Sequence, residues 1–275
     1  MVNLKIPASI FLSIAAVCVA GSVAHAQSGL NMPPPGAKAV APQVATVSKP
    51  ETVFVALDSC RIADTRKNTP IQSNTNRQFI VSGTAGFEIQ GGTAGGCDIP
   101  PAATAVVLSI ADFGSNADGR LTVWPTGTPK PPGINLTFQR GKDAAGVVTT
   151  RLGTAGQISV RSVSATSNVV LDTQGYFIPT ISAIVNADGA LARGSRIVST
   201  ARLGVGSYEV VTDRNVTTCF FTGTIGVPGA GASPAGQIDV AARSGVPNAV
   251  FVRTSDSTGV LSDRPFHLKV NCPVP

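Results

Sequence analysis

The sequence contains little charge, few aromatic residues and almost no histidine. Charged residues make up 13% of the 275 residues, aromatic residues make up 5%, and there are only two histidines. Long runs of Leu, Glu, Lys and Ala are also missing, whereas Gly (29) and Pro (20) are abundant. This composition argues against a helical protein and favours short strands separated by turns.

The motifs that usually carry catalysis or bind zinc are absent as well. No G-x-S-x-G elbow and no C-x-x-C pair occur. His267 is the only histidine after residue 26, and it lies on the polar side of an alternating stretch, where a general base is rarely found. We therefore predict no catalytic residue, no metal and no cofactor.

Carboxylates give a hydrolase only weak support. Most of them lie beside Gly, Pro or Asn, in turn contexts where Asp bonds its own backbone. Asp64 and Asp172 are exceptions and would be the candidates for a glycosidase pair. Residues 111–120, "ADFGSNADGR", are rich in oxygen ligands, but their spacing fits a hairpin loop better than a calcium loop.

The N-terminus has the pattern of an export signal. A short stretch with Lys5 precedes the apolar run "IPASIFLSIAAVCVAG", and "SVAHA" supplies a cleavage site after Ala26. Residues 1–26 are thus predicted to be a signal peptide, with an uncleaved anchor as the alternative, and residues 27–50 a Pro- and Ala-rich linker. No later stretch is long enough to span a membrane. The expected location is secreted, periplasmic or at the cell surface.

Beyond the linker, short apolar segments recur about every ten residues and end at Gly, Pro or Asn. One series fills residues 51–179 and a second fills residues 180–275. We predict an all-β fold of two antiparallel β-sandwich or barrel-like domains. The nearly continuous apolar run "TAVVLSIADFG" is expected to be a strand buried on both faces.

Four cysteines remain after signal removal, which suggests disulfides in an exported chain. Three pairings are possible, and the domain division favours one bridge in each domain. The favoured bridges are Cys60–Cys97 and Cys219–Cys272.

The formal charge of +6 does not indicate nucleic-acid binding, because the arginines are spread along the chain. Loose attraction to anionic surfaces, such as acidic polysaccharide or phosphate-bearing envelope components, is the expected effect. Aromatic side chains suggest another ligand. Trp124, Tyr176 and Phe177 are candidates for stacking on a sugar ring, although the core also needs large side chains.

The stretch "LDSCRIADTR" concentrates charge in a chain that has little. If Cys60 is in a disulfide, its thiol is not available as a nucleophile, and a structural ion pair is the better interpretation. Strand alternation places Arg66 on the same face as Asp64 and Arg61 on the other. We predict that Asp64 pairs with Arg66, with Arg151 as a distant alternative.

Several motifs follow one another in the first series: "CRIADTR", "GGCDIPP", "GRLTVWPTG" and "VVLDTQGYF". In this order they resemble a widespread family of bacterial secreted domains, over about residues 52–178. Residues 183–273, through "VNADGALARGSRIVSTARLGVGSYEV" and "RPFHLKVNC", are similar to a module of bacterial exported and appendage-type proteins. Both resemblances imply β-rich accessory or surface modules, and neither family brings an established catalytic activity.

The sequence thus predicts an exported, non-catalytic structural or adhesive surface protein that contacts envelope or extracellular polysaccharide. The alternative is a carbohydrate-binding module that uses exposed Trp124 and Tyr176, and a secreted hydrolase is third. Nothing in the sequence excludes a homo-oligomer.

Overall fold

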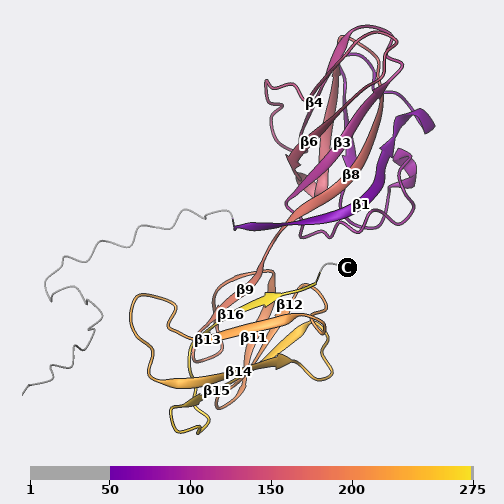
Figure 1. The fold of residues 1–275 in the computed structure, drawn as a ribbon. Coiled ribbons are helices and arrows are strands. Elements are labelled where there is room, and N and C mark those ends of the chain that lie inside the picture. Colours follow the sequence, from indigo (N-terminus) through magenta and orange to yellow (C-terminus); the bar gives the residue numbers. More distant parts are fainter. Residues whose placement is uncertain (1–49, 274–275) are drawn as a thin grey trace, which may run out of the picture. The chain divides into compact units, whose positions relative to one another are not determined.

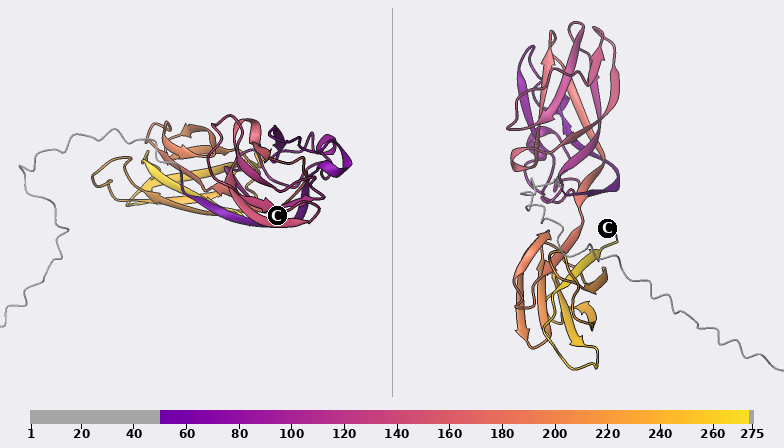
Figure 2. Two further views of the ribbon diagram at one scale, coloured as in Figure 1. Left: turned by 90° about the horizontal axis from the view of Figure 1, so that it is seen from above. Right: turned by 90° about the vertical axis from the view of Figure 1, so that its left-hand side faces the viewer.

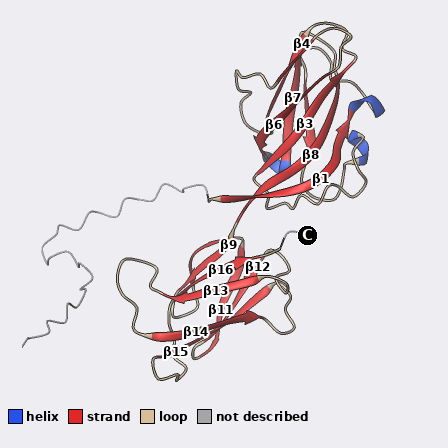
Figure 3. Ribbon diagram, in the orientation of Figure 1, coloured by secondary structure: helices blue, strands red, loops and turns tan. Residues whose placement is uncertain are grey.

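The computed structural model describes residues 50–273 and is built almost entirely from strands (Figure 3). The predicted signal peptide, and the predicted linker apart from Pro50, lie outside the described residues. Three 3₁₀ turns of three residues each are the helical elements of the described part: η1 (Thr65–Lys67), η2 (Glu88–Gln90) and η3 (Thr154–Gly156). Within residues 50–273, no helix has the length and hydropathy of a membrane span.

Eight strands between residues 52 and 179 form two four-stranded antiparallel sheets, which we call the first sandwich (Figure 1). The sheet orders are β1-β8-β3-β6 and β2-β7-β4-β5. The strands are β1 (Thr52–Asp64), β2 (Asn76–Ile80), β3 (Ala105–Phe113), β4 (Gly119–Pro125), β5 (Leu136–Phe138), β6 (Ala144–Arg151), β7 (Gln157–Val163) and β8 (Asn168–Pro179).

Side-chain alternation explains how these sheets enclose a core. On β3, Val106, Leu108 and Ile110 are fully buried, whereas the residues between them are half-buried on the outer face. The prediction that β3 is buried on both faces is therefore wrong. Its outer positions, such as Ala105, Val107 and Ser109, form a surface that no other element covers completely.

Eight further strands between residues 181 and 271 form the second sandwich. Its sheet orders are β10-β9-β16-β13 and β11-β12-β15-β14, all antiparallel. The strands are β9 (Ile181–Val185), β10 (Leu191–Ser195), β11 (Ile197–Gly204), β12 (Ser207–Thr212), β13 (Phe220–Ile225), β14 (Gly236–Ala242), β15 (Ala249–Asp256) and β16 (Phe266–Asn271). The colour bar of Figure 2 allows each set of strands to be followed along the chain.

The all-β fold and both predicted disulfides are confirmed. Cys60 is bonded to Cys97 within the first sandwich and Cys219 to Cys272 within the second, and the sheets stay open rather than closing into barrels. Each sandwich has its own cluster of buried hydrophobic residues. Only Thr180 lies between the end of β8 and the start of β9.

Candidate functional site

The charged opening segment forms an ion-pair network at the end of β1. The Asp64 side chain is 2% exposed and accepts hydrogen bonds from Arg66 Nε (2.9 Å) and Nη2 (2.8 Å). It also accepts from the Arg66 backbone N–H (3.1 Å), which caps η1. The Arg66 side chain holds the pKa of Asp64 below its usual value, against the opposing effect of burial. These contacts fasten the end of β1 to the turn that follows.

The same network corrects the expectation for Arg61. Its Nη1 lies 3.0 Å from Asp64 Oδ2 and its Nε lies 2.5 Å from Asp172 Oδ1, so Arg61 joins two carboxylates. Strand alternation fails here because the β1–β8 register shifts between Arg61 and Ala63. The two carboxylates proposed for a glycosidase are therefore tied to one guanidinium, and one of them is buried.

Trp124 and Tyr176 had to be exposed to stack on a sugar, and both are buried. Trp124 is 5% exposed, although it lies on the outer side of its sheet. The segment 126–135 covers it: Trp124 Nε1 donates to Thr128 O (3.1 Å), and Thr122 Oγ1 donates to Gly133 O (3.0 Å). This cover is a tertiary contact that strand alternation does not reveal.

Tyr176 is 4% exposed because it faces the interior, where it pairs in register with Val55 and Val106. Burial raises the pKa of the Tyr176 hydroxyl, so it stays protonated at neutral pH. The next residue, Phe177, points to the opposite side of β8. Of the three aromatic candidates, Phe177 is therefore the one that stays partly exposed on an outer face.

On that face, Phe177 packs against Phe54, which the sequence analysis did not single out. The two ring centroids lie 5.2 Å apart with an interplanar angle of 51°, and Phe54 is 47% exposed. Phe54 and Phe177 are directly opposite in the β1–β8 register, and Ala105 on β3 continues the row. We call this pair the aromatic platform.

Gly175 makes the platform possible. A Cβ on Gly175 would lie 2.5 Å from Phe54 Cζ and 2.5 Å from Val55 O, so the Phe54 ring occupies the space that a side chain would fill. The backbone at Gly175 also has φ +154°, a conformation that residues other than glycine rarely adopt. The glycine of the "DTQGYF" motif thus leaves room on β8 for the Phe54 ring of the neighbouring strand β1.

A shallow hollow of about 390 Å³ lies beside the platform. Phe177 and Ala105 form its apolar part, while Thr104, Thr149 and Arg151 supply polar groups. Arg151 makes no salt bridge with any carboxylate of residues 50–273. An aromatic ring beside hydroxyl and guanidinium donors can hold a sugar, with apolar C–H groups on the ring and hydroxyls on the donors.

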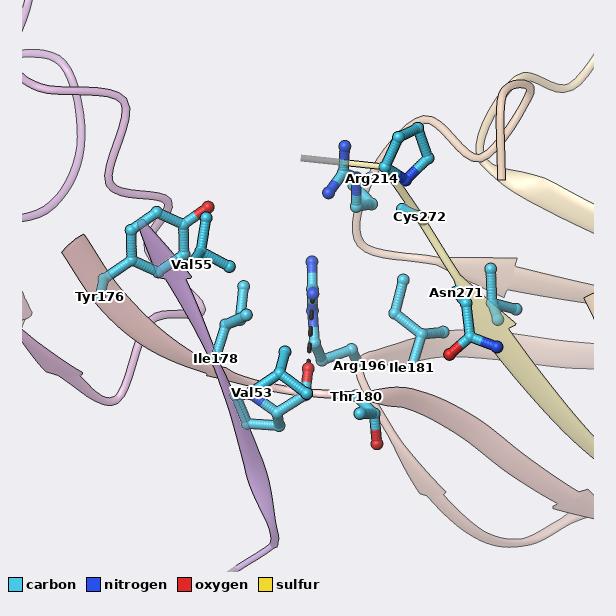
Figure 4. A pocket seen from close by; sticks show the side chains of 13 residues that line it. Val53, Val55, Tyr176, Ile178, Thr180, Ile181, Arg196, Arg214, Asn271 and Cys272 are labelled. Atoms are coloured by element: carbon cyan, nitrogen blue, oxygen red, sulfur yellow. Dashed lines mark hydrogen bonds between the residues drawn. The ribbon is translucent and has the colours of Figure 1, made fainter. Parts of the chain in front are cut away.

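A second pocket surrounds the β8–β9 connection (Figure 4). It is smaller, about 190 Å³, and its lining is mostly aliphatic. Arg196 Nη1 donates to Pro179 O (3.5 Å) and its guanidinium pairs with Asp213 (2.9 Å). Arg214 and Tyr176 also line it, so the pocket offers apolar surface, two guanidinium groups and one buried phenol.

The oxygen-rich loop after β3 uses its side chains within the fold. Asp112 is fully buried and accepts hydrogen bonds from Ser115 Oγ (2.5 Å) and Ser167 Oγ. Asn116 Oδ1 accepts from the Thr166 backbone N–H. Asp118 Oδ1 accepts separately, from the Arg140 backbone N–H. Among the described residues, no group of three metal-ligating side chains converges.

His267 has a hydrogen-bonding role in the second sandwich. Its Nε2–H donates to Val227 O at 3.2 Å, because a carbonyl oxygen can only accept. No Ser hydroxyl or Cys thiol in residues 50–273 forms a hydrogen bond with the His267 ring.

Neither the scan of protein-family models nor the search of curated proteins matched this chain. The sites are therefore interpreted from their own geometry. That geometry favours the aromatic platform, since it is the one aromatic pair found on an exposed sheet face in the described residues.

Proposed function

We propose that the protein is an exported, non-catalytic adhesive β-protein that binds polysaccharide through the aromatic platform of the first sandwich. The observation that carries the proposal is the Phe54–Phe177 pair, held across Gly175 on the outer face of the β1-β8-β3-β6 sheet. A sugar ring stacks on one of these aromatic rings, because its axial C–H groups are apolar and the Phe54 ring is 47% exposed.

Two further observations support export and adhesion rather than catalysis. The Cys60–Cys97 and Cys219–Cys272 disulfides are compatible with an oxidising compartment. Asp64 and Asp172 are both paired with Arg61, and Asp64 also with Arg66, which leaves the two carboxylates poorly suited to acid–base chemistry.

The decisive experiment is a glycan array, followed by affinity electrophoresis of the Phe54→Ala variant on every polysaccharide that retains the protein. Loss of the ring should weaken retention about fivefold, since an aromatic contact contributes about 1 kcal/mol. Ile89→Ala is the matched control, because Ile89 is 74% exposed on η2, away from the platform, and should change nothing.

Two results would oppose the proposal. Retention on no glycan would remove polysaccharide as the ligand. Equal losses in Phe54→Ala and Ile89→Ala would show that the platform is not the contact surface.

A further inference from the structure

The outer face of the β10-β9-β16-β13 sheet carries cations and hydroxyl groups but no carboxylate. The inward residues of β9 and β16 are buried, so the residues between them point outward. We call the outward set the cationic face: Ser182, Ile184, Arg193, Ser195, Phe220, Thr222, Thr224, His267, Lys269 and Asn271.

Strand register brings these side chains into two rows across the sheet. One row contains Thr222, Lys269, Ser182 and Ser195, and the next contains Thr224, His267, Ile184 and Arg193. Lys269 and Arg193 are therefore two strands and one row apart, about 12 Å, with hydroxyl groups in both rows.

Neither cation of this face is neutralised. Within residues 50–273, Lys269 and Arg193 take part in no salt bridge. Arg193 Nη2 donates to Pro228 O (2.8 Å), while Lys269 is exposed without a side-chain hydrogen bond to any described residue. Phe220, at the end of β13, is 72% exposed and adds one aromatic ring.

The other sheet of the same sandwich shows that this imbalance is specific to one face. On its outer face, Arg253 pairs with Asp239 (2.7 Å), and Arg243, just after β14, pairs with Glu209 (3.0 Å). Both faces thus carry two Lys or Arg residues, but only one face supplies the matching acids. Of these two faces, only the cationic face offers an anionic partner cations without a salt bridge.

We infer that the cationic face binds an acidic polysaccharide, with Lys269 and Arg193 paired to its carboxylates and the Ser and Thr hydroxyls in contact with its sugar hydroxyls. Phe220 supplies the ring for one sugar. Nucleic acid fits less well, because bases need several stacking aromatics and this face has one. The inference rests on the proposed function and specifies its ligand as an anionic polymer.

The test compares polygalacturonate with its fully methyl-esterified form, which has the same sugar backbone without the charge. Full-length protein should bind the acid form at least fivefold more tightly by isothermal titration calorimetry in low salt. The preference should disappear in 0.5 M NaCl, where charges are screened beyond a few ångströms.

Two pairs of substitutions locate the binding. Lys269→Gln with Arg193→Gln should weaken binding to the acid form about tenfold and abolish the preference. Arg253→Gln with Arg243→Gln removes the same charge from the opposite face and should change binding less than twofold. Lys269→Gln alone, which disturbs no loop contact, should cause about a threefold loss.

The outcomes separate this inference from the proposed function. Equal binding of both polymers, weakened by Phe54→Ala, would overturn the inference and leave the proposed function standing. Binding to neutral glycans but to neither polymer would also overturn the inference and leave the proposed function standing. Retention on no glycan would overturn both the inference and the proposed function. Tighter binding of single-stranded DNA than of polygalacturonate, with the same Lys269 dependence, would replace the polysaccharide by nucleic acid.

Discussion

The two sandwiches treat charge in opposite ways. The first buries carboxylates: Asp64 is 1% exposed and Asp112 is fully buried, and each is held by several hydrogen bonds. The second keeps its carboxylates outside, as in the Arg253–Asp239 pair, where both side chains are more than half exposed. Buried charge fixes local geometry at an energetic cost, while exposed charge is available to a partner.

The cores differ in the same direction. The first sandwich contains 24 buried hydrophobic residues in its cluster and the second contains 12. The second sandwich is thus the one with less apolar burial and with no buried carboxylate among its described residues. Its stability must depend more on its disulfide.

The largest expected effect is loss of that bridge. The Cys219–Cys272 loop spans 53 residues and the Cys60–Cys97 loop spans 37, and each should contribute about 4 kcal/mol. Cys219→Ser with Cys272→Ser should unfold residues 181–271 at 25 °C, whereas Cys60→Ser with Cys97→Ser should leave residues 52–179 folded. Hydrogen exchange measured by mass spectrometry shows which sandwich unfolds in each variant. Unfolding of the first sandwich but not of the second would show that core size does not determine the dependence on the disulfide.

The next effect concerns ion pairs. Asp64→Asn should lower the free energy of unfolding by about 3 kcal/mol, because it weakens four hydrogen bonds and leaves Arg66 without its partner. The matched change in the second sandwich, Asp239→Asn, should cost less than about 0.5 kcal/mol. Urea unfolding of both variants measures the difference, and similar losses would mean that the Asp64 network is solvated.

The smallest effect is a contrast in pH dependence within the first sandwich. Arg66 lowers the pKa of Asp64, so its stabilisation is present above the unfolded pKa of about 3.9 and is lost as the pH falls through the folded pKa. Burial raises the pKa of Asp112, so its contribution is present below about 3.9 and is lost as the pH rises through the folded pKa.

Substitution of each aspartate by asparagine should show that the two contributions to the free energy of unfolding change with pH in opposite directions. The destabilisation by Asp64→Asn should be larger at pH 6 than at pH 3. The effect of Asp112→Asn relative to the wild type should become more favourable over the same interval. Slopes of the same sign in urea unfolding at the two pH values would contradict this assignment.

Local pattern was enough to predict the strands and the two disulfides, since Gly and Pro mark the turns and Cys60, Cys97, Cys219 and Cys272 divide evenly between the two series. It failed where a contact comes from elsewhere in the chain. Trp124 is covered by residues 126–135, and no alternation rule reports such a cover. This cover buries Trp124, whereas Tyr176 is buried because it faces the interior of the first sandwich.

Two other failures have local causes that the sequence does not display. In "TVFVALD" both faces of β1 read as apolar, so the pattern could not show that Phe54 points outward while Val55 is buried. The register shift between Arg61 and Ala63 reverses the expected faces near the end of the strand. The glycine before two aromatic residues, Gly175–Tyr176–Phe177, was the available sequence signal. It leaves space on β8 for the Phe54 ring of β1.

The pairing of β1 with β8 has a mechanical consequence. Thr52 lies opposite Pro179, so tension that enters at the start of β1 and leaves at the end of β8 pulls both strands from the same end. In this direction the hydrogen bonds rupture one after another, and β1 peels away easily. Peeling stops at Cys60, because the bond to Cys97 carries the load into the rest of the sandwich. Under tension, the part of β1 before Cys60 can therefore detach and extend, while the disulfide limits the extension.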